Sequence, residues 1–315
     1  MQTCLFKISG RKFGLMLWLF CYASFSFGQD LPIVKFDDAW KSKIHSLAPE
    51  KANFPFTEKK KILVFSLHTG FDHWVIPHTE EMIKIISLKS GAFEVTGSKD
   101  IGIFEPANLK NYDAIVLNNT CSKPDHRNLF WDKLRAEFDA DSVLLMVKAM
   151  ELENNLLDYV KNGGGLMVVH GGITTQNKSR AFSKLVGASF DYHPPQQPIQ
   201  VRLEDPKHPL VQVFPKDGFN HVDEPYFYSN AYQDLDFRPL LYFNNEEITD
   251  QRQPAKTGKT YLAWIRSEGK GKVMYCSPSH NAQSFENPDL LKFYLNGLQY
   301  VVGDVDCNDK PLRSF

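Results

Sequence analysis

Short, uninterrupted runs of apolar residues divide this chain into alternating segments, and they constrain its fold more than any other feature. Residues 62–65 and 166–169 are wholly apolar and too short for helices, as expected of strands buried on both faces. Residues 112–117 form a third strand-like run, apolar apart from Asp113. Segments with helical spacing lie between the runs, most clearly at residues 78–90 and 152–161. This alternation predicts an α/β fold with a mostly parallel sheet and helices on both faces.

The remaining elements give weaker signals. Residues 93–96 look like a further strand, and residues 199–203 alternate like a half-exposed one. Residues 261–265 and 272–276 flank the turn Gly269-Lys270-Gly271, which predicts a β-hairpin. A final amphipathic helix is expected over residues 287–302.

The first 28 residues have the order of a secretory signal peptide. Basic residues precede an apolar run over residues 13–23, and small residues stand just before Gln29. The run of 11 residues is about half of a membrane span. We expect cleavage and export to the periplasm or the cell exterior, with a retained N-terminal anchor as the alternative. No other stretch is apolar enough to cross a bilayer.

The rest of the chain predicts one domain over residues 59–304, with an extension over residues 29–58 and a tail over residues 305–315. Without the signal, acidic residues outnumber basic ones and no polybasic run remains, which argues against nucleic acid or an anionic membrane as a partner. The remaining cysteines, Cys121, Cys276 and Cys307, have neither zinc-finger nor disulfide-framework spacing. One disulfide among them and the oligomeric state stay open.

Polar residues follow the ends of the predicted strands, where a parallel sheet gathers its ligand-binding groups. The first strand leads to three histidines, the third to two asparagines and the fourth to a histidine before two glycines. Other polar residues follow less regular segments. The residues concerned are His68, His73, His78, Asn118, Asn119, His170, His193, Asp223, Glu224, Tyr226 and His280.

His170 stands where a short strand meets Gly171-Gly172, in a sequence shaped like a nucleophile elbow. In class I glutamine amidotransferases that turn carries a cysteine, but no cysteine lies within about forty residues of His170. Imidazole cannot form the thioester that glutamine hydrolysis requires, which excludes that activity. His170 is therefore a proton relay, a metal ligand or a hydrogen-bonding group beneath a glycine turn.

Glu224 is the preferred source of a carboxylate. Pro225 holds it extended, and a carboxylate beside histidine suits general acid–base catalysis. An acidic pair in a surface loop is the alternative. We assign His170, Glu224 and His73 as catalytic, and assign to substrate binding Asn118, Asn119, His193, Asp223, Tyr226 and His280.

Histidines at the strand ends could also hold a divalent metal such as zinc, which takes nitrogen and oxygen ligands. His68, His73 and His78 lie five residues apart and lack the i, i+4 spacing of a helical metal site. The candidate ligands are His73, His170, His193 and His280, and Glu224 could converge with them. The alternative is a polar loop whose histidines bind hydroxyls or water, and no other cofactor is indicated.

Taken together, these motifs resemble those of the trehalose-utilisation (ThuA-like) family over nearly all of residues 60–303. The matching pieces are Thr69-Gly70-Phe71-Asp72-His73, residues 112–117, Gly164-Gly165-Leu166 through His170-Gly171, residues 187–194, His208-Pro209-Leu210, Asp223-Glu224-Pro225-Tyr226, residues 263–273 and Ser279-His280. The resemblance implies a flavodoxin-like sheet, related to class I glutamine amidotransferases but lacking their cysteine. It also implies carbohydrate catabolism, including disaccharides such as trehalose or their oxidised 3-keto forms. The chain departs from the family pattern at His68 and in an insertion over residues 123–150.

The leading interpretation is an exported enzyme that hydrolyses, eliminates or isomerises a glycoside or an oxidised sugar. The rival is a non-catalytic carbohydrate-binding protein of a polysaccharide-utilisation system, with Trp74, Trp264 and Tyr226 as stacking platforms. A third reading is an amidase-type hydrolase that uses Cys121.

Overall fold

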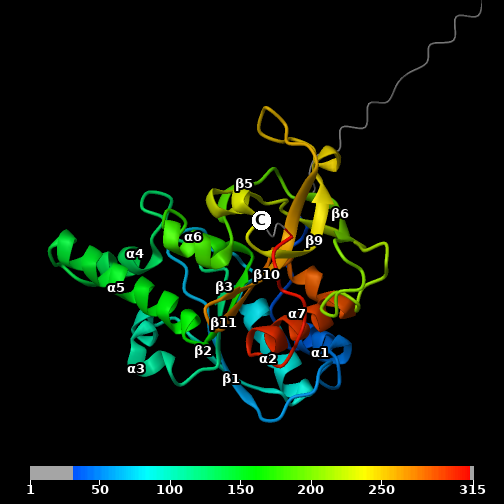
Figure 1. Cartoon of the computed structure of the whole chain (residues 1–315), viewed down its shortest axis with the longest axis horizontal. Coiled ribbons are helices and arrows are strands. Elements are labelled where there is room, and N and C mark those ends of the chain that lie inside the picture. The colour runs from blue at the N-terminus through cyan, green and yellow to red at the C-terminus, as the bar shows by residue number, and fades with distance from the viewer. Residues whose placement is uncertain (1–30, 313–315) are drawn as a thin grey trace, which may run out of the picture.

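A nine-stranded sheet forms the centre of the computed structural model, which describes residues 31–312 (Figure 1). The signal peptide expected over residues 1–28 lies outside the described residues. The strand order is β2-β1-β3-β4-β11-β10-β9-β6-β7, with parallel pairing from β2 to β11 and antiparallel pairing beyond. Within residues 31–312, no helix is both long and apolar enough to cross a bilayer.

The parallel half confirms the α/β prediction. Its strands are β1 (Lys60–Phe65), β2 (Phe93–Ser98), β3 (Ala114–Asn118), β4 (Gly165–Val169) and β11 (Gly271–Cys276). Successive residues of one strand enter different cores: Ile62 and Val64 pack on one face of the sheet, and Leu63 and Phe65 on the other. Because both faces are buried, the strand sequences are continuously apolar.

Helices cover both faces of the sheet (Figure 1). One core is covered by α1 (Asp38–Leu47), α2 (Ile76–Ser90) and α7 (Pro288–Val301). The other is covered by α3 (Pro106–Leu109), α4 (Leu129–Glu137), α5 (Ser142–Lys161) and α6 (Arg180–Val186). In the segment expected as an extension, α1 packs on α2 and buries Trp40 and Ile44.

The antiparallel half contains β6 (Gln197–Leu203), β7 (Phe219–Asp223), β9 (Arg238–Asn244) and β10 (Lys259–Glu268). β10 and β11 form the predicted hairpin, and Gly269 in its turn has a φ of 59°, which glycine adopts readily. A separate two-stranded sheet pairs β5 (Ser189–Tyr192) with β8 (Phe227–Ser229). This two-stranded sheet places residues 189–192 and 227–229 next to the ends of the central strands.

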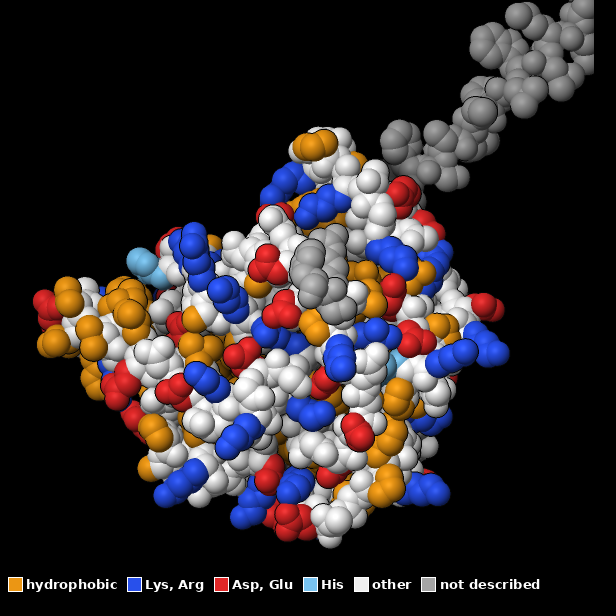
Figure 2. All heavy atoms as spheres, viewed as in Figure 1, with side chains coloured by type: hydrophobic (Ala, Val, Ile, Leu, Met, Phe, Trp, Pro, Cys, Tyr) orange, Lys and Arg blue, Asp and Glu red, His pale blue; other side chains and the backbone are white. Residues whose placement is uncertain are grey.

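The expected insertion, residues 123–150, contains α4 and the beginning of α5, which project from the sheet (Figure 1). Figure 2 shows apolar side chains gathered on this projecting end. Val143, Leu144 and Val147 are exposed there. These exposed apolar residues hid the helical pattern in the sequence. The sequence signal is clearest from residue 152, whereas α5 begins ten residues earlier and is capped there by the Asp141 side chain.

Candidate functional site

Four loops bring three histidines and one glutamate together. His73 follows β1, His170 begins the 3₁₀-helix η2 (His170–Thr174) after β4, Glu224 follows β7, and His280 follows β11. One nitrogen or oxygen atom from each of the four lies within 4.8 Å of the others. We call this set the histidine–glutamate cluster.

Three of the four ligand-type atoms form a nearly equilateral triangle. His170 Nε2 lies 3.3 Å from Glu224 Oε2, and His280 Nδ1 lies 3.2 Å from the same oxygen. His280 Nδ1 and His170 Nε2 are 3.3 Å apart. These separations exceed those of most charge-assisted hydrogen bonds, which are about 2.7–2.9 Å.

The other ring nitrogen of His170 fixes which of its nitrogens carries a proton. Nδ1 lies 2.9 Å from the carbonyl oxygen of Ser277, which can only accept, so Nδ1 donates. In the neutral ring, Nε2 then presents a lone pair to the carboxylate of Glu224. Two acceptors face each other at this distance only when a proton or a metal cation lies near both.

The two glycines after His170 allow the cluster to close. A Cβ atom on Gly171 would come within 2.5 Å of Cys121 Sγ and 2.8 Å of His73 Cε1. His170 itself has a φ of 45° and no exposed surface. The glycine turn therefore lets His73 and His170 pack closely. The turn is part of a 3₁₀-helix, whereas a nucleophile elbow would continue into an α-helix.

Asp223 supports the cluster from behind. Its carboxylate accepts from His221 Nε2 at 2.7 Å and from the backbone nitrogens of Glu224 and His280 at 2.8 and 3.3 Å. Burial acts to raise the pKa of Asp223, but the hydrogen bond from His221 and nearby histidines lower it overall. His221 gave no signal in sequence because it lies within a strand.

The charge states favour ligation. Burial acts to raise the pKa of Glu224, yet its contacts with His170 and His280 hold it far below its usual range, so the carboxylate stays ionised. Burial lowers the pKa of His73 well below its ordinary value, which keeps that imidazole neutral. A carboxylate and a neutral imidazole are the forms that bind divalent metals.

The cluster borders a cavity of about 200 Å³, which we call the cluster cavity. Of the cluster, His73 and Glu224 lie in its wall, together with His193 and Tyr226. The ring of Tyr226 stacks beside His193, with centroids 5.4 Å apart. His193 Nε2 lies 3.7 Å from Glu224 Oε1, the carboxylate oxygen that does not face the cluster triangle. Sequence reasoning missed further lining residues, which are Phe71, Arg127, Thr174 and Phe190.

The profile of the ThuA family, described as trehalose utilisation, matches residues 61–301. This chain belongs to the ThuA family. A search of curated proteins finds no match to it.

Two solved ThuA-like proteins share the fold. The protein from Bacteroides uniformis ATCC 8492 is 18% identical, with a TM-score of 0.59 over 79% of this chain and 94% of the other. The protein from Parabacteroides merdae ATCC 43184 is 16% identical, with a TM-score of 0.54 over 82% and 93%.

In this member of the ThuA family, the ligand-type set differs from the one expected. Glu224 takes the fourth place in the cluster, and His193 lies in the cavity wall beside it. His68 pairs with Asp72 at 3.2 Å, and His78 packs edge-on against Trp40. Of the three histidines after β1, only His73 belongs to the cluster.

The two asparagines after β3 bind protein groups. Asn118 donates to Ser66 Oγ and to the carbonyl of Ile76, each at 3.0 Å. Asn119 donates to Asn118 and accepts from the backbone of Gly171 at 3.3 Å. Neither lines the cluster cavity, so their visible role is to fix the loops that carry His73 and His170.

Cys121 lies against the cluster but lacks the features of a nucleophile. Its Sγ is 3.7 Å from His73 Nδ1 and 3.4 Å from the carbonyl oxygen of Gly171. Burial raises the pKa of this thiol to about 11. The thiol therefore stays protonated near neutral pH, and the neighbouring neutral imidazole supplies no positive charge to ionise it.

The stacking platforms expected for a binding protein are only partly present. Trp264 has no exposed surface and donates to the carbonyl of Val186 at 2.7 Å, so it is a core residue and the expectation was wrong. Trp74 is half-buried and packs against His78. Tyr226 alone of the three lines the cluster cavity.

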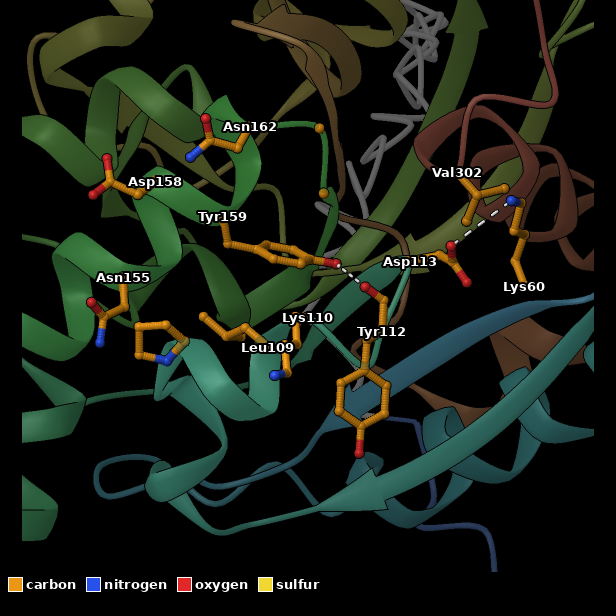
Figure 3. A pocket seen from close by; sticks show the side chains of 13 residues that line it. Lys60, Leu109, Lys110, Tyr112, Asp113, Asn155, Asp158, Tyr159, Asn162 and Val302 are labelled. Carbon is orange, nitrogen blue, oxygen red and sulfur yellow. Dashed lines mark hydrogen bonds and ion pairs between the residues drawn. The ribbon is translucent and has the colours of Figure 1, made fainter.

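A larger cavity, of about 690 Å³, lies near the amino ends of the parallel strands (Figure 3). Figure 3 shows Tyr159 donating to the carbonyl of Tyr112 and Lys60 paired with Asp113. Its lining contains neither histidine nor cysteine. Size alone therefore does not make it the candidate site, because the groups suited to catalysis border the smaller cavity.

Proposed function

We propose that this chain is a metal-dependent enzyme that acts on a small carbohydrate in the cluster cavity. The observation that carries the proposal is the spacing within the histidine–glutamate cluster. A tetrahedral ion with bonds of about 2.0–2.1 Å holds its ligand atoms about 3.3–3.4 Å apart. The three separations within the cluster triangle are 3.2, 3.3 and 3.3 Å.

The surroundings of the cluster support the same proposal. Metal-binding imidazoles usually donate their second nitrogen to a carbonyl or carboxylate, as His170 does to Ser277. Asp223 holds the backbone at Glu224 and at His280. Three imidazoles and one carboxylate suit zinc, and their mixed nitrogen and oxygen donors also suit other first-row divalent ions.

Carbohydrate as the substrate class is supported by the trehalose-utilisation description of the family and by the cavity wall. Rings of Phe71, Phe190 and Tyr226 supply apolar faces, and His193 and Glu224 supply polar edges. The reaction we favour is hydrolysis, elimination or isomerisation of a glycoside or an oxidised, 3-keto sugar. A sheet whose first five strands follow the order β2-β1-β3-β4-β11 also supports the flavodoxin-like assignment.

In the proposed mechanism, Glu224 and His193 have different roles. A bound divalent ion would supply Lewis-acid polarisation of a substrate oxygen or a water molecule. Glu224 holds the site with Oε2 and turns Oε1 toward His193. Because His193 keeps 34% of its side chain exposed, it is placed to exchange a proton with the substrate or solvent, while the ionised carboxylate of Glu224 faces its Nε2.

Metal content tests the proposal first. The chain from residue 29 onward, stripped of metal, is titrated with zinc chloride and analysed for bound zinc, beside His170→Ala and the exposed control His45→Ala. We expect one zinc per chain in the parent and in His45→Ala, and a loss of tight binding in His170→Ala. A parent that binds no divalent metal would overturn the metal-dependent mechanism.

Activity assays test whether the protein is an enzyme. Trehalose, its 3-keto form and related glycosides are assayed with the zinc-saturated parent and Glu224→Gln. Removing the carboxylate should lower the rate by about 10²- to 10⁴-fold. Binding without turnover by the parent, with affinity little changed in Glu224→Gln, would instead identify a carbohydrate-binding protein.

Export to the periplasm or the cell exterior is proposed on the residue order of the first 28 positions alone. Amino-terminal sequencing of the protein from the producing cell's envelope and medium tests it. A mature chain that begins at Gln29 is expected, and an uncleaved Met1 would contradict it.

A further inference from the structure

The cluster cavity contains a cation that the proposed chemistry does not use. Arg127 lines the cavity and lies in the loop between β3 and α4. Its backbone has a φ of 52°, and its nitrogen donates to the carbonyl of Lys123 at 2.9 Å. The loop conformation therefore places the side chain here rather than along a helix.

The guanidinium of Arg127 has few protein partners. Nη1 donates to the carbonyl oxygen of Ser122 at 3.2 Å, and no carboxylate among residues 31–312 forms an ion pair with it. Of the other six arginines among residues 31–312, four each pair with an acid, namely Arg202, Arg238, Arg252 and Arg266. A guanidinium offers five N–H donors, so most of those of Arg127 remain for a ligand.

Charge in the cavity wall points the same way. Of the described residues that line the cavity, Arg127 is the one lysine or arginine and Glu224 the one aspartate or glutamate. A divalent ion in the cluster would leave the site strongly positive. Phe190 and the buried Tyr226 add apolar surface to the cavity wall, and such surface strengthens the attraction for an anion by excluding water.

We propose that Arg127 selects a sugar that carries an anionic group, with a carboxylate as the preferred case. This inference rests on the proposed function of the same cavity. A guanidinium fork matches carboxylate and phosphate geometry in a bidentate manner. The cavity of about 200 Å³ is smaller than the roughly 300–1,000 Å³ of sites for drug-sized ligands, so one sugar ring fits inside. The ligand is a sugar acid, or the acidic ring of a larger glycoside.

Titration calorimetry on the zinc-saturated parent tests this with glucuronate, glucose 6-phosphate and glucose as probes. We expect glucuronate to bind at least about tenfold more tightly than glucose, since a hydrogen-bonded charge pair contributes about 10- to 100-fold. Arg127→Gln should abolish this preference and leave glucose affinity within about twofold. Arg127→Lys should keep part of it, because lysine retains the charge without the fork.

Arg135→Gln is the matched control, because Arg135 is exposed on the neighbouring helix α4. It should preserve the preference for the anion. A preference for glucose 6-phosphate over glucuronate would support an anionic sugar and identify the group as phosphate. Equal affinity of the parent for charged and neutral probes, or no binding of any probe, would overturn the inference.

Failure here is distinguishable from failure of the proposed function. Zinc content and the effect of Glu224→Gln on turnover do not depend on Arg127. An Arg127→Gln protein that folds, binds zinc and still prefers glucuronate would remove only the assignment to Arg127. Circular dichroism and the melting temperature of both arginine variants confirm that the fold is kept.

Discussion

His170 donates a hydrogen bond of 2.9 Å from Nδ1 to the carbonyl oxygen of Ser277, across 107 residues of sequence. The parallel pairing of β4 with β11 explains this contact, because it sets Val169 opposite Cys276 and so brings the next residue of each strand together. The bond orients the imidazole so that Nε2 faces Glu224 and His280. The pairing of β4 with β11 therefore sets the orientation that the His170 ring needs to bind a metal.

The carboxylate of Asp223 should matter for metal binding without being a ligand. Asp223→Asn keeps the size of the side chain but weakens its acceptance from His221 and from the backbone nitrogen of His280. Loss of such outer partners lowers metal affinity by about 10- to 100-fold. Competition against a chromophoric chelator measures the change, with the exposed Asp217→Asn as control. Unchanged zinc affinity in Asp223→Asn would remove this supporting role.

Gly171 should be needed for the position of His73. In Gly171→Ala the new Cβ would contact Cys121 Sγ at 2.5 Å and His73 Cε1 at 2.8 Å, so one of them must move. Overpacking of this kind costs about 1–3 kcal/mol, and we expect weaker zinc binding although no ligand is removed. Adding Cys121→Ala removes one of the two contacts and should restore part of the affinity. Normal zinc binding in Gly171→Ala alone would show that His73 is not held by this contact.

Much of the parallel half was predictable from sequence because its strands are buried on both faces. Continuous apolar runs located β1, β3 and β4, and the residues after them included His73 and His170. The hairpin of β10 and β11 was readable from Gly269. In contrast, Pro239 inside β9 argues against a strand in the sequence, and exposed apolar residues obscured the beginning of α5.

The members of the site were easier to predict than their contacts. Strand-end positions indicate that residues share one edge of a sheet, but side-chain contacts depend on packing between distant segments. Glu224 reaches the cluster from the loop between β7 and β8, and His193 reaches the wall from the loop between β5 and β6, and no local pattern specifies the path of either loop. Arg127 points into the cavity because of a turn at positive φ within the insertion.

The thiol of Cys121 should be dispensable for turnover. Its pKa is raised to about 11 by burial, so it is protonated near neutral pH and a poor nucleophile. Cys121→Ala should keep the rate on any active glycoside within about threefold, whereas catalytic acid–base groups contribute 10²-fold or more. Steady-state kinetics with Glu224→Gln as the reference decides this. A dead Cys121→Ala beside an active Glu224→Gln would favour the amidase-type chemistry.

The buried carboxyl of Glu153 should make stability depend on pH. Glu153 on α5 is 8% exposed and accepts from the hydroxyl of Ser179, which caps α6. Burial raises its pKa above the ordinary 4.5, although the bond from Ser179 opposes this. Since the folded-state pKa is the higher one, the favourable contribution is complete below about pH 4.5 and is lost as pH rises through the folded value.

Glu153→Gln removes the ionisable group and keeps an acceptor for Ser179. The variant should therefore melt at a higher temperature than the parent at pH 7.5, and the difference should shrink steadily toward pH 5. Thermal unfolding of both proteins at each pH measures it, and comparison at equal pH cancels the titration of every other group. The exposed Glu151→Gln on the same helix is the control and should change stability by less than about 0.5 kcal/mol. A gap between Glu153→Gln and the parent that stays constant from pH 5 to 7.5 would show that this carboxyl does not titrate differently in the folded and unfolded chains.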